Sequence, residues 1–210
     1  MRVSKDFVAR VFAMAAEKLA VGGFKKRKLG IFTLGLNTEI IGWLGLNTAH
    51  YQDGVAINPV VGVRHQKLER LIAELLDMKP SEYIPGSFGR PVGYLMPQKE
   101  YASWSFREGD DCEPLVGEMV SAVEKFGRPF MEQNSTLATL YNTLLKSKRG
   151  TPPDQLDFRI AVASVLLGKR EEAETFVDAK LREMGNRNDA AAELFRKFAK
   201  KLRDVPSTCP

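Results

Sequence analysis

Histidine and cysteine are scarce in this chain of 210 residues, which contains two of each: His50, His65, Cys112 and Cys209. Metal sites in proteins draw mainly on clusters of histidine, cysteine and carboxylate ligands. The two histidines are not at helical spacing and no Cys-x-x-Cys pair occurs, so we expect no metal site and no disulfide framework. Two free thiols are typical of a reducing compartment, and the cytoplasm is therefore the expected location.

Long apolar runs are also missing. No stretch approaches the roughly 18 consecutive apolar residues that a membrane-spanning helix needs. The first residues lack the apolar core and cleavage site of a secretory signal, so we expect no membrane association. Apolar residues make up 44% of the chain and charged residues 27%, which is ordinary for a globular protein that buries a core.

The motifs of common enzyme classes are absent as well. The chain has no Gly-x-Ser-x-Gly elbow and no phosphate-binding Gly-x-x-x-x-Gly-Lys-Ser/Thr loop. Cys112 precedes an expected helix, whose N-terminus would lower the pKa of the thiol. No histidine lies near Cys112 in the sequence to activate it, so a cysteine in a helix cap is the simpler interpretation. The sequence therefore identifies no catalytic residue and no cofactor.

The hydrophobic periodicity predicts an α+β fold. Ser4 can cap a helix over residues 4–20 that ends at Gly22. Asp53-Gly54 separates two apolar runs and is typical of a hairpin turn. Five segments rich in apolar and aromatic residues predict strands, at 29–36, 39–47, 55–63, 92–96 and 100–107. We expect an N-terminal helix, an antiparallel meander of about five strands, and a helical C-terminal half.

The helical segments suggest where the chain divides. A helix over 68–76 ends before Pro80, and a second begins near residue 111 and should break at Arg128-Pro129. After a helix over 137–145, residues 146–153 form a basic linker with two prolines. Gly168 and Gly185 then separate three helices. We expect an α+β body of residues 1–149 and a three-helix cap of residues 150–210 packed on it.

Charge is unevenly distributed. Residues 1–35 carry eight Lys/Arg and two acids, residues 100–127 carry two and seven, and residues 146–204 carry fourteen and ten. The net charge is +5 and the isoelectric point about 9.2. Both ends of the chain are thus basic and the middle is acidic, an asymmetry that can steer a binding partner.

Two clusters are candidate contact sites. The basic run 25–28 could bind phosphates, or it could protect an edge strand from aggregation, and we favour the second interpretation. The acidic cluster around residue 111 suits a helix N-terminus, where the helix dipole favours negative charge, and it could also contact a basic partner. The candidate contact residues for a partner or phosphate are Lys25, Lys26, Arg27, Lys28, Arg107, Asp110 and Asp111.

The opening of the chain carries a resemblance. An amphipathic helix followed by Gly23-Phe24-Lys25-Lys26 and a β-meander is similar to small bacterial domains of unknown function found near toxin–immunity and phage-defence genes. The resemblance covers about the first third of the chain and assigns a role to no residue. It implies a non-catalytic, partner-binding protein.

Three functions are compatible with these observations. A non-enzymatic protein-binding module, of immunity or phage-defence type, is the first, because no catalytic set is visible. A nucleic-acid-associated protein that uses its basic terminal segments is the second. An enzyme whose site is assembled from scattered residues such as Glu39, His50, His65 and Arg107 is the third. The sequence identifies neither the partner nor the oligomeric state.

Overall fold

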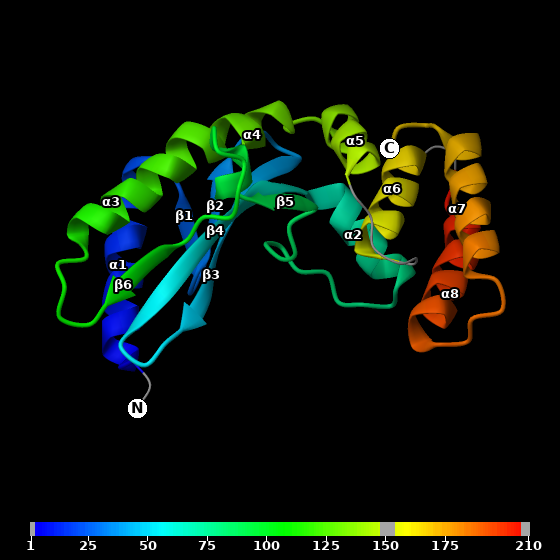
Figure 1. Cartoon of the computed structure of the whole chain (residues 1–210). Helices are drawn as coiled ribbons and strands as arrows, with labels where there is room; N and C mark the ends of the chain where they lie inside the picture. Colours follow the sequence, from blue (N-terminus) through cyan, green and yellow to red (C-terminus); the bar gives the residue numbers. More distant parts are fainter. Residues whose placement is uncertain (1–2, 148–153, 207–210) are drawn as a thin grey trace. The chain divides into compact units, whose positions relative to one another are not determined.

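The computed structural model describes residues 3–147 and 154–206 (Figure 1). These fold into two compact units: unit 1 holds the residues up to Arg64 and Phe88–Ser135, and unit 2 holds His65–Ser87 and the chain from Thr136. The predicted linker residues 148–153, and Cys209, lie outside the described residues.

This division differs from the expected boundary between residues 149 and 150. Helices α2 (Gln66–Leu75) and α5 (Leu137–Lys146) belong to unit 2 because each packs against α6 (Gln155–Leu166). Both helices have strongly apolar faces, which they bury among the C-terminal helices. Unit 2 is therefore assembled from two separate stretches of the chain.

Unit 1 contains a six-stranded antiparallel sheet. Its strands are β1 (Lys25–Lys28), β2 (Ile31–Gly35), β3 (Ile40–His50), β4 (Gly54–His65), β5 (Phe88–Pro91) and β6 (Trp104–Arg107), in the order β1-β2-β3-β4-β5, with β6 also paired to β4. The Oδ1 of Asn37 accepts hydrogen bonds from the backbone N–H groups of Glu39 and Ile40 and shapes the β2–β3 turn. The predicted meander is confirmed.

One edge of the long strand β4 pairs with two short strands, β5 and β6. Its residues 60–63 pair with β5 and its residues 54–57 pair with β6. Pro59, which has no N–H to donate, lies between the two paired segments, where a central strand can tolerate proline. The side-chain amide of Asn58 bridges the same gap by donating to the carbonyl of Ala102 at 2.5 Å.

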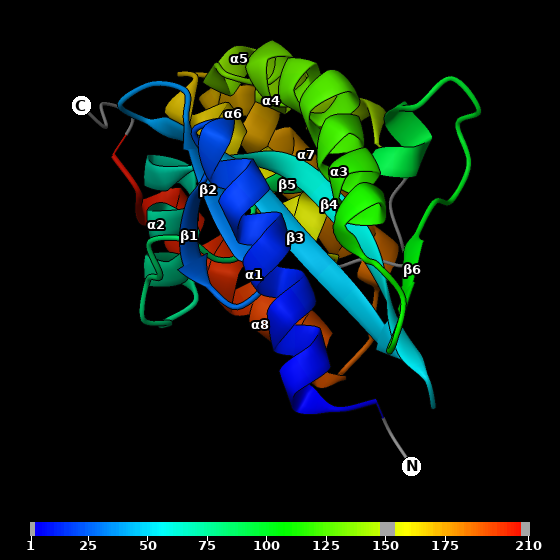
Figure 2. The same ribbon diagram turned by 90° about the vertical axis from the view of Figure 1, so that its left-hand side faces the viewer.

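One face of the sheet is covered by helices. Helix α1 (Lys5–Val21) packs beside α3 (Glu113–Ala122), and α4 (Arg128–Gln133) packs on β3 (Figure 2). The Oγ of Ser4 accepts the Phe7 N–H and Gly22 ends α1, so the predicted first helix is confirmed. Residues from both layers form the core of unit 1, among them Val11, Ala15, Phe32, Leu44, Val116 and Met119, each no more than 1% exposed.

Three local predictions were wrong. The first strand does not begin at Leu29: the basic run forms β1, and Gly30, at φ +72°, makes the turn into β2. Residues 92–95 form a 3₁₀ helix instead of a strand, and within it Gly93 lies too close to the backbone at Glu100 and Ala102 to carry a side chain. Pro129 does not break the helix, because a π-helical turn over 123–127 precedes it and the proline falls in the first turn of α4.

The described residues of unit 2 are helical apart from the connections between the helices. With α2, α5 and α6 it contains α7 (Arg170–Met184) and α8 (Ala190–Asp204). Phe158 lies edge-to-face with Phe195 and Phe198, with ring centroids 5.3 and 4.8 Å away. Asp189 caps α8, and a hydrogen bond from Arg187 lowers the pKa of its carboxyl group.

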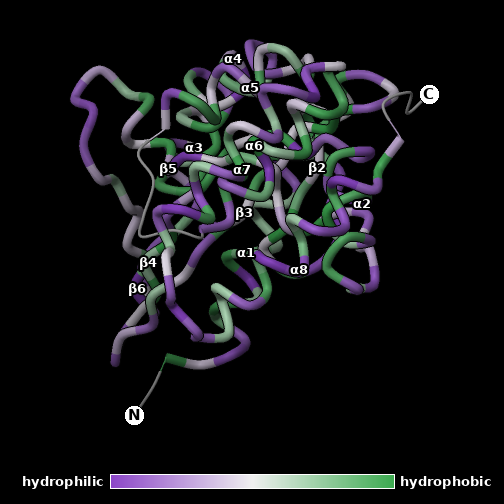
Figure 3. The backbone as a smooth tube through the Cα atoms, turned by 90° about the vertical axis from the view of Figure 1, so that its right-hand side faces the viewer, coloured by the Kyte–Doolittle hydropathy of each residue, from purple (hydrophilic) through white to green (hydrophobic). Residues whose placement is uncertain are grey.

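None of the described helices is long and apolar enough to cross a membrane, and in Figure 3 the hydrophobic parts of the tube are short and interrupted by hydrophilic ones.

Candidate functional site

The basic run forms the outermost strand of the unit 1 sheet. All four residues of β1, Lys25 to Lys28, are exposed. Strand β1 pairs with β2 on one side, and within residues 3–147 and 154–206 no strand pairs with its other side. Strand β1 is therefore an edge strand among the described residues, and all four of its side chains are cationic.

The four cations project from both faces of this edge. Lys26 lies opposite Phe32, whose ring is 1% exposed beneath the helices, and Lys25 lies opposite Thr33 on the other face. The Nε of Arg27 donates to the Oγ1 of Thr33 at 2.8 Å, which places Arg27 on that second face. The register shifts between Lys26 and Lys28, a bulge that twists the edge.

Exposed apolar side chains flank the strand at both ends. Val21, the last residue of α1, is 92% exposed, and Leu29, directly after β1, is 63% exposed. Between them Phe24 is buried and anchors the start of the strand beneath Arg128, whose guanidinium lies 5.6 Å from the ring centroid. A 2.6 Å hydrogen bond to Glu124 raises the pKa of Arg128 and keeps it charged. We call Val21, Lys25–Lys28 and Leu29 the basic edge.

The remaining predicted contact residues lie at the opposite edge of the sheet (Figure 2). Arg107, at the end of β6, forms a loose 3.8 Å ion pair with Asp53, and both side chains are 72% exposed. Asp110 donates its backbone N–H to the carbonyl of Arg107, and the side chain of Asp111 accepts the N–H of Glu113. The structure thus does not bring the seven candidate residues together, and the two acids shape a turn and the start of α3.

Cys112 is not an activated thiol. It sits in the cap position of α3 but is 6% exposed, and burial raises the pKa of its thiol. Arg10 acts in the opposite direction, and the carboxylates of Asp110 and Asp111 add to the rise. The expected lowering of this pKa was wrong, because desolvation of the thiolate by burial outweighs the opposing effect of Arg10.

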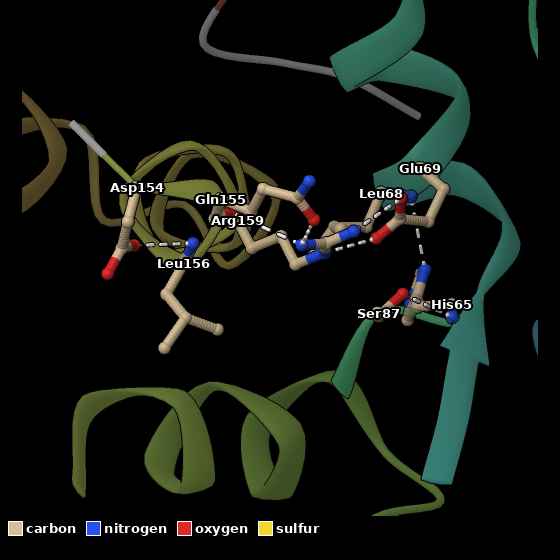
Figure 4. A network of polar contacts seen from close by, with 8 residues as sticks. All are labelled: His65, Leu68, Glu69, Ser87, Asp154, Gln155, Leu156 and Arg159. Carbon is tan, nitrogen blue, oxygen red and sulfur yellow. Dashed lines mark hydrogen bonds and ion pairs between the residues drawn. The ribbon is translucent and has the colours of Figure 1, made fainter. Parts of the chain in front are cut away.

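Unit 2 contains a buried polar network, drawn in Figure 4. Arg159 on α6 donates through Nε to Glu69 on α2 at 2.7 Å, and the two side chains are only 8% and 4% exposed. A second guanidinium nitrogen reaches the other oxygen of Glu69 at 3.3 Å, which makes the pair bidentate. Arg159 also donates to the backbone and side-chain oxygens of Gln155.

His65 belongs to this network as a helix cap. Its Nδ1 accepts the backbone N–H of Leu68 at 3.2 Å, and its own backbone N–H donates to the Oγ of Ser87 at 3.0 Å. His65 is 1% exposed. These bonds start α2 and hold Ser87 beside it, so they account for a buried histidine in structural terms.

Three of the scattered residues of the enzyme hypothesis lie in unit 1. Glu39 lies in the β2–β3 turn, His50 at the end of β3 and Arg107 at the end of β6, and all three are exposed. Among the described residues, no group of three or more histidines, cysteines and acids is placed to hold a metal ion.

Two features were missed by the sequence reasoning. The exposure of Val21 and Leu29 was missed: Val21 directly follows the predicted helix over residues 4–20, and Leu29 was assigned to a strand. The ion pair of Glu69 and Arg159 joins residues 90 positions apart, and no local sequence pattern predicts it.

Comparison with known proteins gives no match, whether with family models, curated sequences or solved structures.

Proposed function

We propose that this chain is a non-enzymatic protein-binding module that recognises its partner through the basic edge. The observation that carries the proposal is an outermost strand made only of exposed cations and flanked by two exposed apolar side chains. A few lysines suffice to prevent edge-to-edge aggregation. The exposed side chains of Val21 and Leu29 add apolar contact area at the two ends of this cationic strand.

The geometry favours a protein partner over a nucleic acid. Single-stranded nucleic acids bind where cations alternate with aromatic side chains on which bases stack. The exposed aromatics of unit 1 are Tyr51, Tyr94 and Tyr101, in the β3–β4 turn and the connection between β5 and β6. They lie away from β1, and the cations of β1 project from both faces and do not form one row along a phosphate backbone.

The biological setting of the proposal is a bacterial cytoplasm, in an immunity or phage-defence role. The resemblance of the first third of the chain supports that role, and the free, buried Cys112 is compatible with a reducing compartment.

The test is affinity purification of the tagged chain from its native host, with and without nuclease, followed by mass spectrometry. It compares the wild type with the triple variant Lys25→Glu, Lys26→Glu, Lys28→Glu. The control carries Lys79→Glu, Lys197→Glu and Lys200→Glu, which change the same charge at exposed positions of unit 2.

We expect one stoichiometric protein that survives nuclease, is retained by the control and is lost by the edge variant. A partner retained by the edge variant contradicts the proposal. A partner lost on nuclease treatment, together with co-purifying nucleic acid whose binding falls steeply with salt, replaces the proposal with the nucleic-acid alternative.

A further inference from the structure

We infer, on the basis of the proposed function, that the partner presents an acidic extended segment that joins the unit 1 sheet as an additional strand beside β1. Recognition by strand addition uses main-chain hydrogen bonds for affinity and side-chain contacts for specificity. The basic edge offers both main-chain groups and side chains for such contacts.

No strand in the described parts of the chain pairs with the outer side of β1. All its strand pairing is with β2, and no other described strand reaches it. Four strand residues span about 13 Å, at a rise of about 3.3 Å per residue. The edge therefore accepts a segment of about four to six residues.

The cations define the charge of that segment. In an antiparallel or parallel pair, neighbouring side chains on the same face lie close enough to interact, and like charges directly opposite one another are destabilising. Because Lys25 and Lys26 lie on opposite faces of the sheet, side chains on both faces of an added strand meet a cation. Consecutive acidic residues, and not acids at every second position, satisfy this arrangement.

The same charges exclude competing strands. Pairing of β1 with β1 of a second copy would set four cations against four cations, so the edge disfavours self-association. A neutral apolar strand would bury the lysine ammonium groups without an opposite charge. The edge is thus selective for an acidic strand as well as protected from aggregation.

The apolar residues at the two ends of the basic edge further define the sequence expected of the partner segment. Val21 lies four residues before β1 and Leu29 directly follows it, and both offer apolar surface to a segment that extends past the acidic core. The segment that fits is a short acidic stretch with an apolar residue at one or both ends.

The test uses synthetic peptides and the full chain. The parent peptide has four consecutive glutamates with a leucine on each side. A second peptide is identical but N-methylated at alternate residues, which retains the charges and side chains and removes backbone donors. Binding is measured by calorimetry, and protection of the β1 amides by hydrogen exchange monitored by NMR.

We expect the parent peptide to protect the amides of β1. N-methylation, or the triple variant Lys25→Gln, Lys26→Gln, Lys28→Gln, should each weaken binding about tenfold or more, since several exposed charge contacts or backbone bonds are lost together. The control variant Lys79→Gln, Lys197→Gln, Lys200→Gln should bind as the wild type does.

Failure of this inference differs from failure of the proposed function. If the host partner depends on the basic edge but the N-methylated peptide binds as well as its parent, or the β1 amides stay unprotected, strand addition is wrong and the binding function stands. If partner capture is indifferent to the edge variant, the proposed function itself is wrong. An oligonucleotide that binds the edge in place of the acidic peptide overturns both.

Discussion

Unit 1 and unit 2 use charged residues in opposite ways. On the basic edge of unit 1, Lys25, Lys26 and Lys28 are exposed and form no ion pair within the described parts of the chain. In unit 2, Glu69 and Arg159 are buried and make a bidentate pair with each other. An exposed cation remains hydrated and can exchange water for a partner at little cost, whereas a buried pair has lost its water and depends on its own geometry. The first arrangement serves binding, and the second serves the fold.

The largest effect is expected when the buried pair is broken. Glu69→Ala leaves the guanidinium of Arg159 buried without a carboxylate, and we expect it to destabilise the protein by about 3–5 kcal/mol. Chemical denaturation monitored by circular dichroism measures this loss. The double variant Glu69→Leu, Arg159→Met, which removes both charges, should recover most of it. A single variant as stable as the wild type would mean that the pair does not hold α2 and α6 together.

A smaller effect is expected at the end of α8. The guanidinium of Arg170 donates to the carbonyls of Arg203 and Val205 and pairs with Glu174 at 2.8 Å, and it is 22% exposed. Arg170→Ala removes the cation that satisfies the last carbonyls of the helix. We expect a loss of about 1–2 kcal/mol, because hydrogen bonds to charged groups are worth more than neutral ones but this site is partly hydrated. Glu174→Ala, which spares those carbonyls, is the control and should cost less.

The basic edge should contribute almost nothing to stability. The triple variant Lys25→Gln, Lys26→Gln, Lys28→Gln should unfold within about 0.5 kcal/mol of the wild type, as surface substitutions usually do. The same variant is expected to lose partner binding, which separates the two uses of charge in one protein. A large loss of stability would show that the lysines hold the sheet edge, and the contrast between the units would fail.

The smallest effect is expected at Cys112, which is a buried titratable group in unit 1. Burial raises the pKa of its thiol, so less thiolate is present at a given pH than in an exposed cysteine. In a Cys209→Ser variant, alkylation by iodoacetamide should be slower than that of a model thiol at neutral pH and should rise only above the usual thiol range. The buried thiol also makes stability depend on pH. Its contribution to the free energy of unfolding is complete below the pKa of the unfolded state and is lost as the pH rises toward the higher pKa of the folded state. Alkylation as fast as the model thiol would contradict the burial.

Features with local causes could be predicted from the sequence. Ser4 and Gly22 bound α1, and the connection between β3 and β4 falls directly before Gly54, the first residue of β4, since capping and turn chemistry depend on a few adjacent residues. The α+β class followed from the same patterns.

Features with distant causes could not be predicted. In the 3₁₀ helix at 92–95, Gly93 packs against backbone seven and nine residues further along the chain, at Glu100 and Ala102, and in the π-helical turn before Pro129, Gly127 fits against Val61 of the sheet. The candidate site was found in part: the basic run was recognised, but its position as an outermost strand with exposed apolar ends required the sheet order.

The discontinuity of unit 2 has a consequence for biosynthesis. Ribosomal synthesis delivers Glu69 on α2 90 residues before Arg159 on α6. Unit 1 is complete in the nascent chain once Ser135 has emerged, while α2 still lacks the helices that bury its apolar face. During that interval the apolar face of α2 has no C-terminal helices to cover it, and a fragment limited to residues 150–210 would lack α2 altogether.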